Sequence, residues 1–139
     1  MKIGEEERTA LREASEEAKR SGRLSKERVA ELRSVFGERF EKALRLLEEK
    51  RVKQYTFEPS GRVVWVVVGK EKEYQILPRA GYCSCDDFYF RVINGETGLC
   101  YHLIAQSLAE ALGVYEEIRE GDEFYDSLLA EWRSQSLEP

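Results

Sequence analysis

The sequence has few cysteines and almost no histidine, with three and one respectively in 139 residues. An odd number of cysteines cannot be fully paired, and a disulfide between Cys83 and Cys85 would close a very strained small ring. These features argue against the disulfide framework of secreted domains and favour thiols that are kept reduced. We therefore expect a cytoplasmic protein, in the sense of an intracellular, reducing environment.

Long hydrophobic runs are also missing. No stretch of eighteen apolar residues is present, and no apolar run follows a basic start at Met1. A membrane-spanning helix needs about 20 predominantly apolar residues, and a secretory signal needs an apolar segment behind a basic one. The sequence therefore predicts neither a transmembrane helix nor a signal peptide, and we expect no membrane partner.

Charge is plentiful but unevenly placed. The net charge is −5, yet residues 1–51 carry a small excess of basic residues and residues 52–139 a large excess of acidic ones. The densest group of basic residues, hereafter the basic cluster, comprises Lys19, Arg20, Arg23, Lys26 and Arg28. It is explained either by a solvated junction between two helices or by phosphate binding.

The first half of the chain reads as helical. Residues 5–20 have only a thin apolar stripe, so we expect a marginal, mostly solvated helix, and residues 1–24 form a charged helical arm. Ser25 is a predicted N-cap for a stronger amphipathic helix that continues to Leu47. Gly37 lies inside its pattern, and because the stripe continues in register we expect a tolerated glycine or a small kink.

The second half combines strands with helices. Three strand-like runs at residues 51–57, 62–68 and 73–77 predict an antiparallel meander whose valine-rich central strand is covered on both faces. Helices are expected at 102–112 and 122–133. The prediction is one α+β domain over residues 25–139, with N-terminal helices, a three-stranded antiparallel meander, and a zinc-binding knuckle leading into C-terminal helices.

All three cysteines and the single histidine fall within residues 83–102, the segment hereafter called the knuckle. Their order is C-x-C-x14-C-x-H, and the expected ligands of one structural Zn²⁺ are Cys83, Cys85, Cys100 and His102. Three cysteines and one histidine are a typical closed set for structural zinc. Because Cys100 and His102 are about 200° apart on a regular helix, we expect them at its entrance. The sequence does not indicate which imidazole nitrogen binds.

Other residues in the knuckle and directly before it have two interpretations each. Asp86 and Asp87 can accept a hydrogen bond from His102 or cap the following turn. The aromatic residues can offer a stacking platform for bases or fill the core around the metal. They are Tyr82, Phe88, Tyr89, Phe90 and Tyr101.

The ligand pattern, the valine-rich strands before it and the continuation Leu103-Ile104-Ala105 resemble the SWIM zinc finger. The sequences around Cys83-Ser84-Cys85 and Cys100-Tyr101-His102 are similar to those of small archaeal SWIM proteins. The resemblance covers about residues 29–132. SWIM modules occur in chromatin-remodelling ATPases, transposases, a ubiquitin ligase and small partners of RecA-like recombinase paralogues, so the resemblance implies binding to DNA or protein.

Because the knuckle carries one basic residue against three acidic ones, it lacks the charge expected of a phosphate reader. We therefore expect a non-enzymatic zinc module that acts as a protein-interaction adaptor in DNA recombination or repair. The resemblance suggests a RecA-like recombinase paralogue as its partner. The alternatives are direct DNA binding through the basic cluster and, in another class, a metallo-hydrolase, which would require an open metal position.

Overall fold

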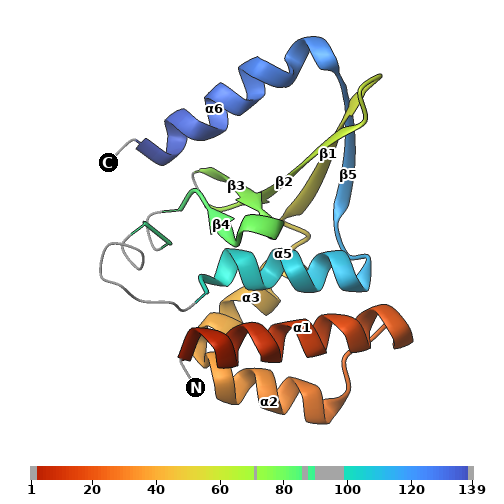
Figure 1. The fold of residues 1–139 in the computed structure, drawn as a ribbon, viewed down its shortest axis with the longest axis vertical. Coiled ribbons are helices and arrows are strands. Elements are labelled where there is room, and N and C mark those ends of the chain that lie inside the picture. Colours follow the sequence, from red (N-terminus) through yellow and green to blue (C-terminus); the bar gives the residue numbers. More distant parts are fainter. Residues whose placement is uncertain (1–2, 71, 86–87, 90–98, 138–139) are drawn as a thin grey trace.

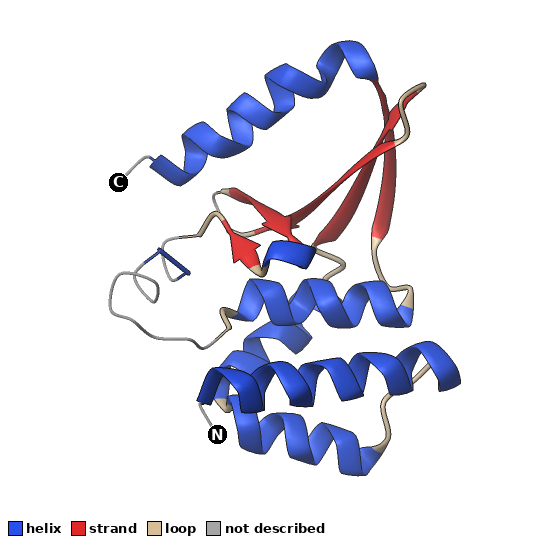
Figure 2. Cartoon of the chain, viewed as in Figure 1, coloured by secondary structure: helices blue, strands red, loops and turns tan. Residues whose placement is uncertain are grey.

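The computed structural model describes residues 3–70, 72–85, 88–89 and 99–137 (Figure 1, Figure 2). In chain order its elements are α1 (Ile3–Ser21), α2 (Lys26–Phe36), α3 (Glu38–Glu48), β1 (Val52–Glu58), β2 (Arg62–Val68), β3 (Glu73–Leu77), the 3₁₀ turn η1 (Pro78–Ala80), β4 (Tyr82–Cys83), α5 (Tyr101–Leu112), β5 (Glu116–Gly121), the 3₁₀ turn η2 (Asp122–Phe124) and α6 (Tyr125–Leu137). The α+β class is confirmed.

The predicted long helix is in fact two helices. Its start is as expected, because the Ser25 hydroxyl accepts the Arg28 N–H at 3.1 Å as the N-cap of α2. The expectation that Gly37 is tolerated inside the helix was wrong. Gly37 has φ +60° and ψ −129°, a backbone conformation that is essentially restricted to glycine. This residue ends α2 and precedes α3.

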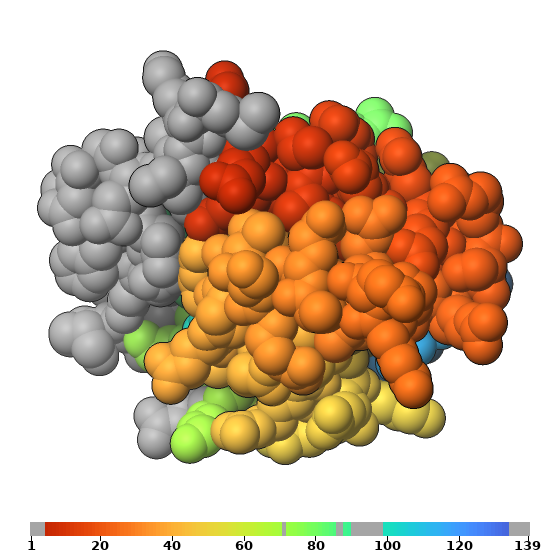
Figure 3. Space-filling model, turned by 90° about the horizontal axis from the view of Figure 1, so that it is seen from below, coloured from red at the N-terminus to blue at the C-terminus, as the bar shows by residue number. Residues whose placement is uncertain are grey.

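Helix α1 is packed, so the expectation of a mostly solvated helix was wrong. Ala14 and Ala18 are fully buried, and α1 lies along α5, where the Ser15 and Ser107 hydroxyls are 2.9 Å apart. Small side chains allow two helices to approach closely, and the resulting contact is buried despite the few large apolar residues. In the view of Figure 3, α1 and α2 lie side by side on the surface. The division of the chain near residue 24 stays a prediction.

The sheet is larger than the predicted meander. β1, β2 and β3 do form consecutive antiparallel pairs, but the sheet has five strands in the order β4-β3-β2-β1-β5. β4 pairs antiparallel with β3, whereas β5 pairs parallel with β1. The three-stranded antiparallel prediction is therefore corrected to a five-stranded mixed sheet.

The sheet lies between two helical layers (Figure 1). On one face, Trp65 and Val67 of β2 join a core formed with α1, α2, α3 and α5. On the other face, Val64 and Val66 pack with Trp132 of α6. The central strand is thus covered on both sides, as its uninterrupted apolar sequence predicts.

The C-terminal elements differ slightly from expectation. α5 ends at Gly113, which adopts the left-handed conformation with φ +72°, as predicted for a glycine stop. The last helix begins at Tyr125 rather than residue 122, because Asp122–Phe124 form the separate turn η2. Among the described helices, none has the length and apolar character needed to cross a membrane.

Candidate metal centre

The first half of the site is built by the short edge strand β4 and the residues after it. Ser84 lies between Cys83 and Cys85, and its N–H donates to the Gln75 carbonyl at 3.1 Å. Its hydroxyl accepts the Gln75 N–H at 3.0 Å. Because residues i and i+2 of an extended segment project to the same side, these bonds hold Ser84 against β3 and leave both cysteines facing the opposite way.

The second half of the site is the start of α5. Cys100 is the N-cap residue, with φ −76° and ψ 159°, and His102 lies in the first turn. The helix entrance was the expected place for this pair. The His102 ring packs against both Tyr74 and Tyr101, with ring centroids 4.6 Å and 4.2 Å away, and these two contacts restrict its orientation.

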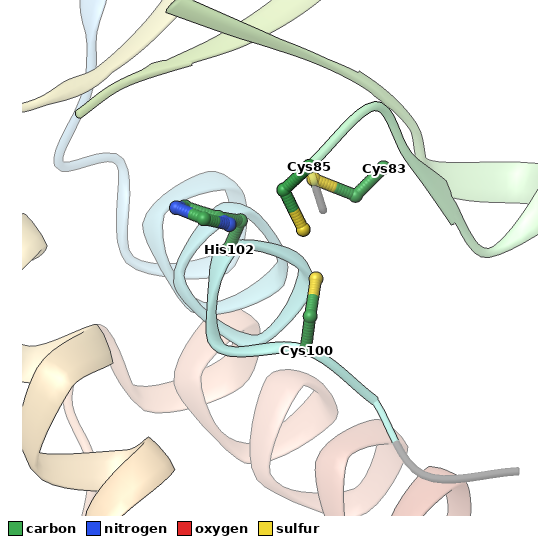
Figure 4. Close-up of side chains that lie close together, drawn as sticks. All are labelled: Cys83, Cys85, Cys100 and His102. Atoms are coloured by element: carbon green, nitrogen blue, oxygen red, sulfur yellow. The ribbon is translucent and has the colours of Figure 1, made fainter. Parts of the chain in front are cut away.

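These two halves meet. One potential ligand atom from each of Cys83, Cys85, Cys100 and His102 lies within 4.8 Å of every other. Figure 4 shows the three sulfur atoms facing one another beside the His102 ring. Two sulfurs bound tetrahedrally at about 2.3 Å from zinc would be about 3.8 Å apart, so only small shifts separate this arrangement from a coordination shell. All four residues are buried.

The chemistry of the group fits a divalent cation. Burial raises the pKa of the Cys83 thiol, whereas hydrogen bonds from Cys100 and Cys83 lower the pKa of Cys85. The neighbouring groups thus stabilise the thiolate of Cys85. Ionisation of a second cysteine in this buried space would be opposed by desolvation and by repulsion between like charges. A metal ion reverses that balance because coordinated thiols are deprotonated.

The imidazole supplies a second indication. Nδ1 of His102 is buried and has no hydrogen-bond partner among the described residues. Leaving a buried polar atom unsatisfied costs about 1–3 kcal/mol, and metal coordination would satisfy it. The unsatisfied atom therefore makes Nδ1 the nitrogen that fits a metal ligand, a choice that the sequence left open.

A buried ion pair supports the site from a distance in sequence. Arg39 of α3 donates to both carboxylate oxygens of Glu7, at 2.9 Å and 2.6 Å. The same two side chains hold the backbone of Leu99, whose N–H donates to Glu7 at 2.9 Å and whose carbonyl accepts from Arg39 at 2.6 Å. This network fixes the residue that directly precedes Cys100.

The Glu7 network was missed by the sequence interpretation, although a signal exists. Glu7 precedes Leu11, Ala14 and Ala18 at helical spacing, so it lies on the buried stripe of α1 and is itself only 3 % exposed. A carboxylate at such a position requires a buried partner. The sequence could not identify that partner as Arg39, which lies on another helix.

The surroundings of the metal centre are also more basic than the knuckle alone suggests. A hollow of about 550 Å³ beside Tyr101 and His102 is lined by basic residues of α3, the α3–β1 connection and the β2–β3 turn. These residues are Lys42, Arg45, Arg51 and Lys70. They are distant from the knuckle in sequence, so a charge count restricted to the knuckle could not find them.

The basic cluster is only partly available to a ligand. Lys19, Arg20, Arg23 and Lys26 are exposed near the junction of α1 and α2. Arg28 instead donates to Glu17 at 2.6 Å and to Glu31 at 3.0 Å, and its guanidinium lowers the pKa of Glu17. The structure therefore separates Arg28 from the other four.

The remaining candidate residues in and beside the knuckle differ in how exposed they are. Asp86, Asp87 and Phe90 lie outside the described residues. Phe88 packs edge to face against Tyr82, with centroids 5.3 Å apart, and both Phe88 and Tyr101 are partly buried against the core. The more exposed aromatics are Tyr82 and Tyr89.

Comparison with known proteins gives a consistent result. No family model matches the chain. It is 30 % identical over 129 residues to zinc finger SWIM domain-containing protein 7 of Homo sapiens, a match that covers 91 % of each chain. The chain belongs to the zinc finger SWIM domain-containing protein 7 family. The mouse protein of that name is 33 % identical over 87 % of this chain and 80 % of its own length.

A relative from outside the mammals matches as well. The Dictyostelium discoideum homologue is 29 % identical over 87 % of this chain and 79 % of its own length. Membership, together with the convergent cysteines and histidine, supports the SWIM-type zinc finger that the ligand pattern indicated. The resemblance to archaeal SWIM proteins in particular stays a prediction.

Proposed function

We propose that the protein is a non-enzymatic module that holds one structural Zn²⁺ through Cys83, Cys85, Cys100 and His102. The observation that carries this proposal is the convergence of four buried donors from two separate segments. Four protein ligands complete a tetrahedral shell and leave no position for a catalytic water. The ion would supply the charge that three buried thiolates need and would join β4 to α5.

Metal analysis of the purified protein tests this part of the proposal. We expect one equivalent of zinc per chain, lost in Cys100→Ser, and a loss of cooperative unfolding in the C-terminal half when the metal is removed. The matched control is Ser107→Ala on the same helix, which should retain the metal. A metal-free protein that unfolds as cooperatively as the zinc-loaded one would refute a structural role.

We further propose that the module is a protein-interaction adaptor in DNA recombination or repair, with a RecA-like recombinase paralogue as its partner. The support is the SWIM resemblance, together with an exposed apolar edge beside the metal centre. Leu77 and Tyr82 are paired across β3 and β4 and are 44 % and 37 % exposed. Such side chains can contribute to a protein interface.

Affinity purification from the native source, with nuclease treatment, tests the adaptor role. Recovery of a RecA-like ATPase that survives nuclease and weakens in Leu77→Ser/Tyr82→Ser would support it. Phe124→Ser is the matched control, because Phe124 is 49 % exposed but lies in η2. Recovery that disappears with nuclease, or the absence of any RecA-like protein, would refute the proposal.

A second candidate function is direct DNA binding through the basic cluster. It is favoured by the exposure of Lys19, Arg20, Arg23 and Lys26 on one junction. Binding to single- and double-stranded DNA should then weaken steeply with salt and decrease in a Lys19/Arg20/Arg23→Gln variant. No measurable affinity at low salt would exclude this candidate.

A further inference from the structure

A second concave surface is lined by residues of α5 other than Tyr101 and His102. It is a hollow of about 530 Å³ between α1, α5 and η1, hereafter the arginine hollow. Arg8 and Arg12 line it from α1 and Arg79 lines it from η1. Arg8 and Arg12 are four residues apart and therefore share one face of the helix, so two segments distant in sequence place three arginines around one space.

The side chains of these three arginines are not taken up by carboxylates of the described residues. In that part of the chain, the guanidinium groups of Arg8, Arg12 and Arg79 make no ion pair and no hydrogen bond. Elsewhere in the described part of the chain, carboxylates are contacted by Arg28, Arg33, Arg39, Arg51, Arg62 and Arg119. Since the chain has more acidic than basic residues, three unpaired arginines around one hollow are not explained by a shortage of carboxylates.

The rest of the lining is suited to a polar ligand with an apolar part. Among the described residues that line the hollow, Glu110 is the one acidic residue, and its carboxylate already accepts from the Gln106 amide at 2.9 Å. Ser15 and Ser107 offer hydroxyl groups, while Leu11 and Leu103 offer buried apolar surface. The lining thus combines a positive charge with hydrogen-bonding groups and an apolar floor.

We propose that the arginine hollow binds the phosphate of a nucleotide, either a free mononucleotide or a residue of a nucleic acid strand. The guanidinium fork matches the geometry of phosphate oxygens and binds them through paired hydrogen bonds. The volume lies in the range of about 300–1,000 Å³ that is typical of small-molecule sites, so it has room for more than the phosphate. Arg8 and Arg20 are twelve residues apart on α1, about 18 Å along the helix axis, so this site is distinct from the basic cluster.

The test is an NMR titration of the zinc-loaded, full-length protein with inorganic phosphate, AMP and a short oligothymidylate. We expect amide shifts at Ser15 and Ser107 that saturate. In Arg8→Gln/Arg12→Gln the affinity should fall at least tenfold. The matched control is Arg20→Gln/Arg23→Gln, which removes the same charge from the basic cluster and should change the affinity less than twofold.

The probes distinguish the source of the phosphate. Saturation by AMP at Ser15 and Ser107 indicates a free nucleotide, whereas saturation by oligothymidylate alone indicates a strand. Arg79→Gln provides a second variant on the exposed turn η1, which keeps the test valid if the α1 variant fails to fold. Equal losses in the two double variants, or no saturable shift at the hollow with any probe, would overturn the proposal, whatever the outcome for zinc.

Discussion

Removing the carboxylate of Glu7 should weaken both the fold and the metal centre. Losing one partner of a fully buried ion pair costs about 3–5 kcal/mol. Because the Arg39 side chain is 21 % exposed and can be partly rehydrated, we expect about 2–3 kcal/mol for Glu7→Ala, which includes the loss of the Leu99 hydrogen bond. In urea this corresponds to a midpoint lower by about 1–2 M.

The effect on the metal follows from the position of Leu99. With its N–H released, the segment that enters α5 through Cys100 is less restricted. Losing groups that orient the ligands typically weakens metal binding by about 10–100-fold, so zinc should transfer to a colorimetric chelator at least tenfold faster in Glu7→Ala.

The matched control for this experiment is Glu6→Ala. Glu6 is the exposed neighbour of Glu7 on α1, and its replacement makes the same change in charge. Exposed substitutions of this kind usually shift stability by less than about 0.5 kcal/mol. If Glu7→Ala and Glu6→Ala give the same urea midpoint and the same zinc transfer rate, the proposed link between α1 and the metal centre is refuted.

Three further predictions concern the scaffold. Burial raises the pKa of Tyr55 to about 12. The contribution of the neutral Tyr55 side chain to folding stability is therefore complete below about pH 10 and is lost as the pH rises through 12. Absorbance at 295 nm should show this late titration in the wild type but not in Tyr55→Phe. Trp132→Ala should lower the free energy of unfolding in urea by about 3–5 kcal/mol, whereas Phe124→Ala should lower it little. Similar losses in the two variants would contradict the core assigned to the sheet face that α6 covers. Gly37→Ala should destabilise the protein by about 1–3 kcal/mol because Gly37 has a positive φ. The control is Ser34→Ala on the exposed face of α2. A stabilised Gly37→Ala variant would instead show that α2 and α3 can form one continuous helix.

The sequence predicted those parts of the structure that depend on local chemistry. Ser25 and Gly113 mark helix ends because a hydroxyl cap and a left-handed glycine act within one turn. The candidate metal ligands are grouped within twenty residues, and their side-chain types alone restrict the possible chemistry.

The features that were missed depend on partners far along the chain. β5 has the sequence Glu-Glu-Ile-Arg-Glu-Gly, which lacks the apolar alternation of a strand, and only its backbone pairing with β1 makes it one. The packing of α1 depends likewise on its contact with α5, and the Glu7–Arg39 pair joins residues 32 positions apart. Such pairings are set by tertiary structure, which overrides local propensity.

The parallel pairing of β5 with β1 also has a consequence for the order of folding. As the chain is synthesised, β1 is complete by Glu58, but the partner for its outer edge begins only at Glu116. Until then that edge presents unpaired backbone groups, the feature that makes strands prone to associate with other chains. The knuckle and α5 lie between the two strands in sequence, so β5 can cover the open edge only after both of these segments have been synthesised.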